Sequence, residues 1–289
     1  MRLLIFGFGF TGRALARSHP AEWRLSGAAR NPDIRRAMAD QGVEAVDPNN
    51  RADLAEALES ADALLVSAPP DVDGCPGLRA LGPLLDRAGP RPHWIGYLST
   101  TGVYGDRRGG WVFEDGELAP RSAEAERRVQ AEQGWTELAA RRRVGLSVFR
   151  LPGIYGPGRS PLERVRTGEA RRVAKPGQVF SRIHVDDLAA GLIAAIARPD
   201  RAGIYNLCDD LPAPPSDVTA YAARLLGQEP PPEEPFDPAA LSPAAQRFWG
   251  ESKRVANAKA KGAFGWRPRY PTYREGLAAI LEAEKLTAG

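Results

Sequence analysis

Residues 1–18 read MRLLIFGFGFTGRALARS, an apolar run that passes through three glycines into a helical pattern. A strand followed at once by G-x-G-x-x-G and a helix is the fingerprint of a dinucleotide-binding turn. Gly7 permits the tight turn, Gly9 removes the Cβ that would hold the backbone away from a pyrophosphate, and Gly12 lets the helix pack closely on the strand. The helix N-terminus adds free N–H groups and the positive end of a dipole. We therefore predict that residues 7–12 bind a diphosphate; the alternative is a glycine-rich turn without a ligand.

The first half of the chain alternates short apolar runs with helical patterns. The apolar runs predict strands at 3–6, 25–29, 43–46, 63–67, 94–99 and 146–151, and the segments between them predict helices at 12–18, 34–41, 53–59 and 78–88. Strands that are apolar throughout are buried on both faces, and strands joined through helices form right-handed βαβ units. The predicted fold class is α/β, a Rossmann doubly wound parallel sheet with a smaller C-terminal substrate lobe.

The second half is less regular, and it predicts two lobes that interleave along the chain. The dinucleotide-binding Rossmann domain is expected to span 1–155 and to receive about 182–208 as well. The smaller, substrate-binding lobe is expected to consist of 156–181 and 209–289.

Four further segments carry local predictions. A helix is expected at 185–197 and a strand at 203–208. The run 227–238 holds five prolines and is predicted to lack regular structure. The charged run 122–143 predicts a mostly solvated helix.

The composition is that of an ordinary globular protein, with 43% hydrophobic and 26% charged residues. The net charge of +3 comes from scattered arginines without a dense basic block, so we expect a small anionic ligand and no nucleic acid. No run of about 18 apolar residues occurs and the first strand begins at the N-terminus, so neither a membrane span nor export is expected. Cys75 and Cys208 stand outside any ligand-spaced cluster, which predicts buried reduced thiols, no metal site and a cytoplasmic protein. The sequence leaves the oligomeric state open between a monomer and a homodimer.

The end of the second predicted strand reads Ala28-Ala29-Arg30-Asn31, where NAD-binding chains carry a carboxylate for the ribose. The guanidinium of Arg30 could bind a 2′-phosphate, and Arg35 would add positive potential one helical turn further on. The sequence thus favours NADP, with NAD possible; a solvated surface arginine is the alternative for Arg30. The loop after the fourth strand, with Ser67, Ala68 and Pro69, is expected to line the same crevice.

Six segments in order resemble the extended short-chain dehydrogenase/reductase superfamily, the NAD-dependent sugar epimerases and dehydratases. They are GFGFTG from Gly7, LSTTGVYG at 98–105, FRLPGIYGPGR at 149–159, RIHVDDLA at 182–189, GIYNLCDD at 203–210 and FGWRPRYPTYREGL at 264–277. The resemblance implies that Thr100 is the catalytic Ser/Thr, that residues 152–155 border the nicotinamide, and that residues 184–187 lie where the lobes meet. The full set of expected cofactor contacts is Gly7, Gly9, Phe10, Thr11, Gly12, Arg30, Asn31, Arg35, Ser67, Ala68, Pro69, Ser99, Pro152 and Ile154.

The chain departs from that family at its Tyr-x-x-x-Lys pair, in which a phenol moves a proton and a lysine lowers its pKa. A Glu commonly follows this pair in the family, and we match it to Glu132. This alignment places Glu124 at the Tyr position and Arg128 at the Lys position, so the chain resembles the superfamily's atypical subgroup. Glu124 could act as a base beside Arg128, or the two could form a surface ion pair. Tyr104 and Tyr155 are the other candidate proton donors, and His184 is expected to be structural.

Two functions follow from these residues. The first is an NAD(P)-dependent oxidoreductase or epimerase-like enzyme with a non-standard active site, acting on a small or nucleotide-sugar-like substrate. The second is a non-catalytic NADP-binding redox sensor or regulatory interaction protein. An anionic substrate could meet the basic side chains of the second half, or these could form a solvated loop: Arg159, Arg164, Arg166, Arg171, Arg172 and Lys175.

Overall fold

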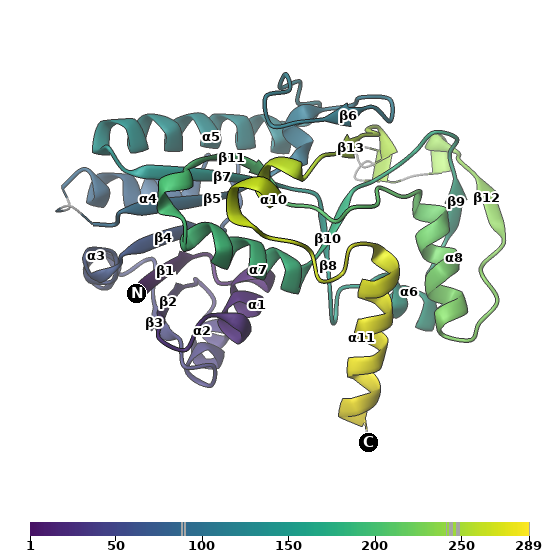
Figure 1. Cartoon of the computed structure of the whole chain (residues 1–289), viewed down its shortest axis with the longest axis horizontal. Helices are drawn as coiled ribbons and strands as arrows, with labels where there is room; N and C mark the ends of the chain where they lie inside the picture. Colours follow the sequence, from purple (N-terminus) through teal and green to yellow (C-terminus); the bar gives the residue numbers. More distant parts are fainter. Residues whose placement is uncertain (88, 90, 241, 243–244, 247–248, 289) are drawn as a thin grey trace.

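The computed structural model describes residues 1–87, 89, 91–240, 242, 245–246 and 249–288. Its centre is a seven-stranded sheet of order β11-β7-β5-β4-β1-β2-β3 in which every neighbouring pair is parallel (Figure 1). The strands are β1 (Arg2–Phe6), β2 (Arg24–Ala28), β3 (Glu44–Val46), β4 (Ala63–Val66), β5 (Trp94–Thr100), β7 (Gly145–Leu151) and β11 (Gly203–Asn206). The predicted Rossmann sheet is confirmed, with strand ends that differ from the predicted ones by one or two residues.

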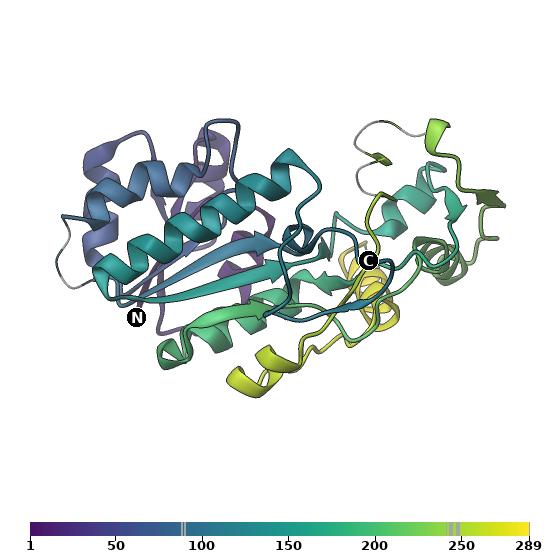
Figure 2. The ribbon, with the colours of Figure 1, turned by 90° about the horizontal axis from the view of Figure 1, so that it is seen from above.

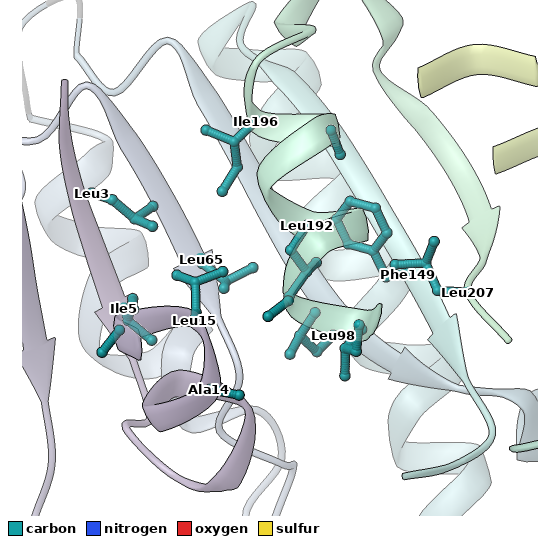
Figure 3. Packing of buried hydrophobic residues seen from close by; sticks show 14 of the residues in the cluster. Leu3, Ile5, Ala14, Leu15, Leu65, Leu98, Phe149, Leu192, Ile196 and Leu207 are labelled. Carbon is teal, nitrogen blue, oxygen red and sulfur yellow. The ribbon is translucent and has the colours of Figure 1, made fainter. Parts of the chain in front are cut away.

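Both faces of the sheet are covered because its strands are apolar on both sides. Leu3 and Ile5 of β1 belong to one buried cluster, with the helices α1 (Phe10–Ser18), α2 (Pro32–Ala39), α7 (Val185–Ile196) and α10 (Ala258–Phe264). Leu4 and Phe6 belong to the cluster on the opposite face, with α3 (Arg51–Ser60), α4 (Pro76–Leu85) and α5 (Ala123–Arg142). Figure 3 shows Leu3 and Ile5 of β1 and side chains of α1 and α7 in the first cluster.

The helix α5 differs from its prediction because one of its faces is buried. Ala131, Trp135 and Leu138 lie at helical spacing and join the cluster on β5 and β7. The other faces of the helix carry the exposed charges from which a mostly solvated helix was predicted. For α4, the predicted C-terminal residue Ala88 lies outside the described residues.

A smaller lobe lies beyond the carboxyl ends of the strands, at the right of Figures 1 and 2. Its core packs together α6 (Pro161–Arg166), α8 (Pro215–Leu225) and α11 (Tyr273–Ala288). The prediction that 227–238 lacks regular structure is wrong for β12 (Glu233–Pro235), which pairs in parallel with β9 (Arg172–Ala174). Two-stranded pairing leaves both strands with an open edge, and an edge strand tolerates proline.

Two short strand pairs lie between the two lobes (Figure 1). They are β8 (Gly153–Tyr155) with β10 (Arg182–His184), and β6 (Trp111–Val112) with β13 (Arg254–Val255). The 3₁₀ turn η1 (Thr101–Tyr104) follows β5, η2 (Pro199–Arg201) precedes β11, and η3 (Pro238–Ala240) follows β12. After β13 the chain returns to the sheet, where Ala260, Phe264 and Trp266 join the first cluster. The expected smaller lobe, 156–181 and 209–289, included this returning segment.

Two expectations about the chain as a whole can be compared with the structure. Cys75 and Cys208 are buried and free, as predicted. None of the described helices is both long and apolar enough to cross a membrane.

Candidate functional site

The glycines of the first turn have three different surroundings. Gly7 has φ +98°, and a Cβ there would stand 2.5 Å from the backbone nitrogen of Ala68. A Cβ on Gly12 would come within 3.1 Å of the ring of Phe8. A Cβ on Gly9 would meet nothing within 4 Å, so Gly9 faces open space at the start of α1. The turn is therefore shaped for backbone contact with a ligand, and a diphosphate fits both this space and the positive end of α1.

This space belongs to a cavity of about 1280 Å³ at the carboxyl edge of the sheet. Its walls come from the ends of β1, β2, β3 and β4, and include Phe6, Gly7, Phe8, Gly9, Ala28, Ala29, Arg30, Asn31, Pro32, Ile34, Pro48, Asn49, Ser67, Ala68, Pro69, Pro70, Asp71, Pro76, Arg79 and Ala80. Most of the expected cofactor contacts on these four strands are thus brought together. Open parallel sheets bind ligands at this edge.

The segment after β2 presents one arginine to this cavity and uses another to hold its own backbone. Arg30 is exposed and lines the cavity. Arg35 donates to the carbonyl oxygens of Ala29 and Arg30, at 2.7 and 2.9 Å, and pairs with Asp47 at 3.1 Å. Arg35 therefore supports the turn and is not among the described residues that line the cavity.

An ion pair that sequence reasoning missed lines the same cavity. Arg79 donates two hydrogen bonds to the carboxylate of Asp71, at 2.9 and 2.8 Å. These bonds, with a smaller contribution from the charge of Arg30, lower the pKa of Asp71. Asp71 follows the Ser67–Pro70 loop directly, and this position was the signal that could have identified it.

A second cavity, of about 660 Å³, lies at the ends of β5 and β7. It is lined by Thr100, Thr101, Gly102, Arg121, Ser122, Pro152, Gly153, Phe180, Ser181, Arg182, Gly250, Glu251, Lys253 and Val255. Thr100 is half-buried, and its Oγ1 accepts a hydrogen bond from the backbone N–H of Gly102 at 3.1 Å. Pro152, which was predicted to contact the cofactor, lines this cavity, whereas Ile154 lines a separate cavity of about 150 Å³.

The second cavity has a basic lining: Arg121, Arg182 and Lys253 against one carboxylate, Glu251. Glu251 pairs with Lys253 at 2.5 Å. Burial lowers the pKa of Arg182 and, although Glu251 opposes it, that of Lys253. An anion entering this cavity would meet an excess of positive charge.

The basic residues expected to meet an anionic substrate lie elsewhere. Of the six, none is among the described residues that line the second cavity. Arg166, Arg171 and Arg172 pair with glutamates of the smaller lobe, Arg159 lies over the ring of Phe10, and Lys175 donates to the carbonyl oxygen of Trp249.

A buried polar network lies beneath the second cavity. Ser99 donates to Glu132, which also accepts a hydrogen bond at 2.8 Å from Arg150. Arg150 donates to the hydroxyl of Tyr104 at 3.1 Å, and Tyr104 donates to Asn206 at 2.8 Å. Burial raises the pKa of Tyr104. Ser99 and Tyr104 are therefore held inside the fold, outside the described linings of both cavities.

The two residues predicted to stand at the superfamily's Tyr and Lys positions are also absent from the described lining of the second cavity. Glu124 is exposed in the first turn of α5 and is not among the described lining residues. Arg128 donates to the carbonyl oxygen of Leu98. This hydrogen bond ties α5 to β5.

Tyr155 and His184 lie in the interior where the two lobes meet. The hydroxyl of Tyr155 is 3.5 Å from the carbonyl oxygen of Thr272, and burial raises its pKa. The Nδ1 atom of His184 accepts a hydrogen bond from the backbone N–H of Asp186 at 3.2 Å and so caps α7. Burial lowers the pKa of His184 and favours the neutral ring, which fits the structural role expected for it.

The sheet order, the glycine turn and the two cavities at the carboxyl edge of the sheet define a protein with a Rossmann fold. The dTDP-glucose 4,6-dehydratase of Bacillus anthracis str. Ames in complex with NAD has the same fold, with a TM-score of 0.79 and 18% identity, over 99% of this chain and 97% of that one. No family model matches the chain.

Three relatives are more similar in sequence than that dehydratase is. Protein YeeZ of Escherichia coli (strain K12) is 30% identical over 246 residues, which cover 80% of this chain and 85% of that protein. The chain therefore belongs to the family of Protein YeeZ. A functionally unknown conserved protein from Silicibacter pomeroyi DSS is 46% identical, with a TM-score of 0.90, over 98% of this chain and 99% of that one. A 3-diazoavenalumate denitrifying reductase from Streptomyces sp is 32% identical over 141 residues, or 45% of each chain.

Proposed function

We propose that the protein is an NADP-dependent oxidoreductase of the epimerase/dehydratase type that acts on a small anionic substrate. The observation that carries the proposal is the order of the two cavities along one sheet edge. The glycine-lined cavity is at the ends of β1, β2, β3 and β4, and the Thr100-lined cavity follows at the ends of β5 and β7. A dinucleotide in the first would direct its reactive end toward the second.

The first cavity fits the cofactor through its backbone. The open space at Gly9 admits a diphosphate, and the first N–H groups of α1, from Phe10 and Thr11, lie next to it. Arg30 would bind the 2′-phosphate that distinguishes NADP from NAD, because a guanidinium matches phosphate geometry. When bound, the nicotinamide supplies or accepts a hydride.

The second cavity supports the choice of substrate. Its excess of positive charge favours an anion, and its volume of about 660 Å³ suits a small molecule. Thr100 would hydrogen-bond the substrate oxygen through its hydroxyl hydrogen while its Oγ1 stays bound to the N–H of Gly102. The name of the Streptomyces relative, a reductase, agrees with this reaction class.

A non-catalytic NADP-responsive binding protein is the second candidate. It is favoured by one observation: the exposed Glu124 and the backbone-bound Arg128 replace the proton-moving pair of the family. Such a protein would bind the cofactor and change its partners or oligomeric state with the redox state of the nicotinamide.

Calorimetric titration with NADPH and NADH tests the cofactor. We expect Arg30→Ala to weaken NADPH binding about 10- to 100-fold, the loss of one charge-assisted phosphate contact, and to leave NADH binding unchanged. Arg24→Ala is the matched control, because Arg24 is exposed at the opposite end of β2 and is not among the described residues that line the first cavity. Equal weakening for both nucleotides would contradict the assignment to NADP.

Turnover separates the two candidates. The chain with NADPH and a panel of anionic carbonyl compounds should lose the absorbance of the reduced nicotinamide, and Thr100→Ala should slow this loss. A chain that binds NADPH and turns over no member of the panel would favour the binding protein.

A further inference from the structure

The second cavity contains few side chains able to move a proton. Among the described lining residues, those that carry a charge are Arg121, Arg182, Glu251 and Lys253. A guanidinium keeps its proton at any working pH, so neither arginine can serve. Lys253 and its partner Glu251 are the two titratable groups left at this surface.

The chain holds Lys253 in place from both sides. Ser252 donates its backbone N–H to Asp106 at 2.9 Å and its hydroxyl to the carbonyl oxygen of Gly177 at 3.0 Å. Val255 donates its N–H to the hydroxyl of Ser181 at 3.0 Å. Segments 106–112 and 177–181 thus fix the 251–255 segment, which is the kind of support that preorganises a reacting group.

The surroundings of Lys253 favour loss of its proton at a lower pH than usual. Its side chain is 10% exposed, and this burial lowers its pKa below the ordinary 10.5. Glu251, paired at 2.5 Å, and Asp106 oppose this shift, whereas Arg107 adds to it. Arg121 and Arg182 line the same cavity as Lys253 and add two further positive charges to it. A lysine whose pKa approaches the working pH is an effective acid–base group.

The composition of the chain makes this position unusual. Only five of its 39 basic residues are lysines. The chain uses arginine at nearly all its basic positions but presents a lysine, the one basic side chain that can release its proton, to this cavity.

We propose that Lys253 is the proton donor of the reaction, in place of the tyrosine of the Tyr-x-x-x-Lys pair in the short-chain dehydrogenase/reductase superfamily. The inference rests on the proposed function. When a substrate carbonyl carbon receives a hydride from the reduced nicotinamide, the electron pair of the C–O π bond moves to oxygen. The Nζ–H bond of Lys253 then breaks, and its proton forms the O–H bond of the product alcohol. Lys253 is left as a neutral amine that recovers a proton from water, and Glu251 stabilises the restored ammonium.

The titration of Lys253 can be measured without any substrate. Lysines labelled with ¹³C at Cε give five signals, and Lys253→Arg identifies the one from Lys253. We expect its midpoint below the ordinary 10.5. A midpoint at or above 10.5 would overturn the proposal, whatever the turnover.

Turnover supplies the second readout. Lys253→Ala should lower kcat about 10²- to 10⁴-fold while NADPH affinity stays native, and added ethylamine should restore part of the rate. Lys261→Met is the matched control, since Lys261 has a similar ion pair with Asp210 outside the cavity. A rise in KM with native kcat, or a loss that no amine restores, would assign Lys253 to binding or to structure.

The outcomes separate this inference from the proposed function. If Lys253→Ala reduces a substrate as fast as the native chain does, Lys253 is not the proton donor, but the protein is still an oxidoreductase. If the native chain binds NADPH and reduces no substrate, both the proposed proton donor and the proposed oxidoreductase are refuted.

Discussion

Substituting Gly9 by alanine separates the proposed nucleotide-binding role of the first turn from its role in folding. At this position φ is −102°, and a Cβ would meet no protein atom within 4 Å. Replacing glycine reduces the entropy of the unfolded chain, worth about 0.4–1 kcal/mol in favour of the variant, but alanine is a poorer N-cap by a similar amount. We therefore expect the free energy of unfolding of Gly9→Ala to change by less than about 1 kcal/mol.

Cofactor binding should respond very differently. The new methyl group would stand where the backbone approaches the diphosphate and would separate one or two N–H groups from it. Each charge-assisted hydrogen bond contributes about 1.5–3 kcal/mol, so the loss corresponds to about a 10- to 100-fold weaker Kd for one bond and more for two.

Calorimetric titration with NADPH, alongside urea denaturation, measures both effects. Gly262→Ala is the control, because a Cβ at Gly262 in α10 also meets open space but lies outside the described linings of both cavities. Gly7→Ala should lose stability as well as binding, since Gly7 has φ +98° and its Cβ would clash with Ala68. Native NADPH affinity in Gly9→Ala would refute the reasoning for the whole site.

Three further predictions concern charges inside the fold. Glu132→Ala should lower the free energy of unfolding by about 3–5 kcal/mol, because it leaves the buried charge of Arg150 without its partner; urea denaturation measures it, and a loss below about 1 kcal/mol would contradict it. Glu251→Gln should lower the ¹³C titration midpoint of Lys253, since Glu251 raises that pKa, and an unchanged midpoint would mean that the pair is not formed in solution. Burial raises the pKa of Asp209 to about 8, so the folded state keeps a proton that the unfolded state releases above about pH 4. Stability should therefore fall as pH rises from about 4 to 8, by up to about 1.4 kcal/mol per pH unit, and Asp209→Asn should flatten this fall in denaturation midpoints; parallel curves would argue against it.

The sheet could be predicted because its strands are buried on both faces. Leu3 to Phe6 point alternately into two different clusters, and only a continuous apolar run satisfies both. The strand β12 could not be predicted, because its pairing with β9 depends on a segment about sixty residues away and its prolines suppress the local signal. The buried face of α5 was hidden because its apolar residues are few among many charges.

The candidate site was predictable where a backbone rule applies and not where distant segments meet. The turn at Gly9 follows from the glycine spacing after a strand, and Thr100 was identified only through the resemblance of LSTTGVYG to the superfamily. Lys253 carries no motif and reaches the cavity only because β13 pairs with β6. The signal in the sequence that could have pointed to Lys253 was the rarity of lysine in a chain whose basic residues are nearly all arginines. The buried hydrogen bonds of Tyr104 depend on Arg150 and Asn206, which become neighbours only because β7 pairs with β11.

The return of the chain to the sheet after β13 has a consequence for dissecting the protein. Ala260, Phe264 and Trp266 complete the cluster that Leu3 and Ile5 begin. A truncation that keeps every residue of the glycine turn but stops before Ala260 would remove these three side chains and uncover the part of the cluster that they pack against. A fragment that ends there is therefore expected to lose stability even though it keeps the whole glycine turn.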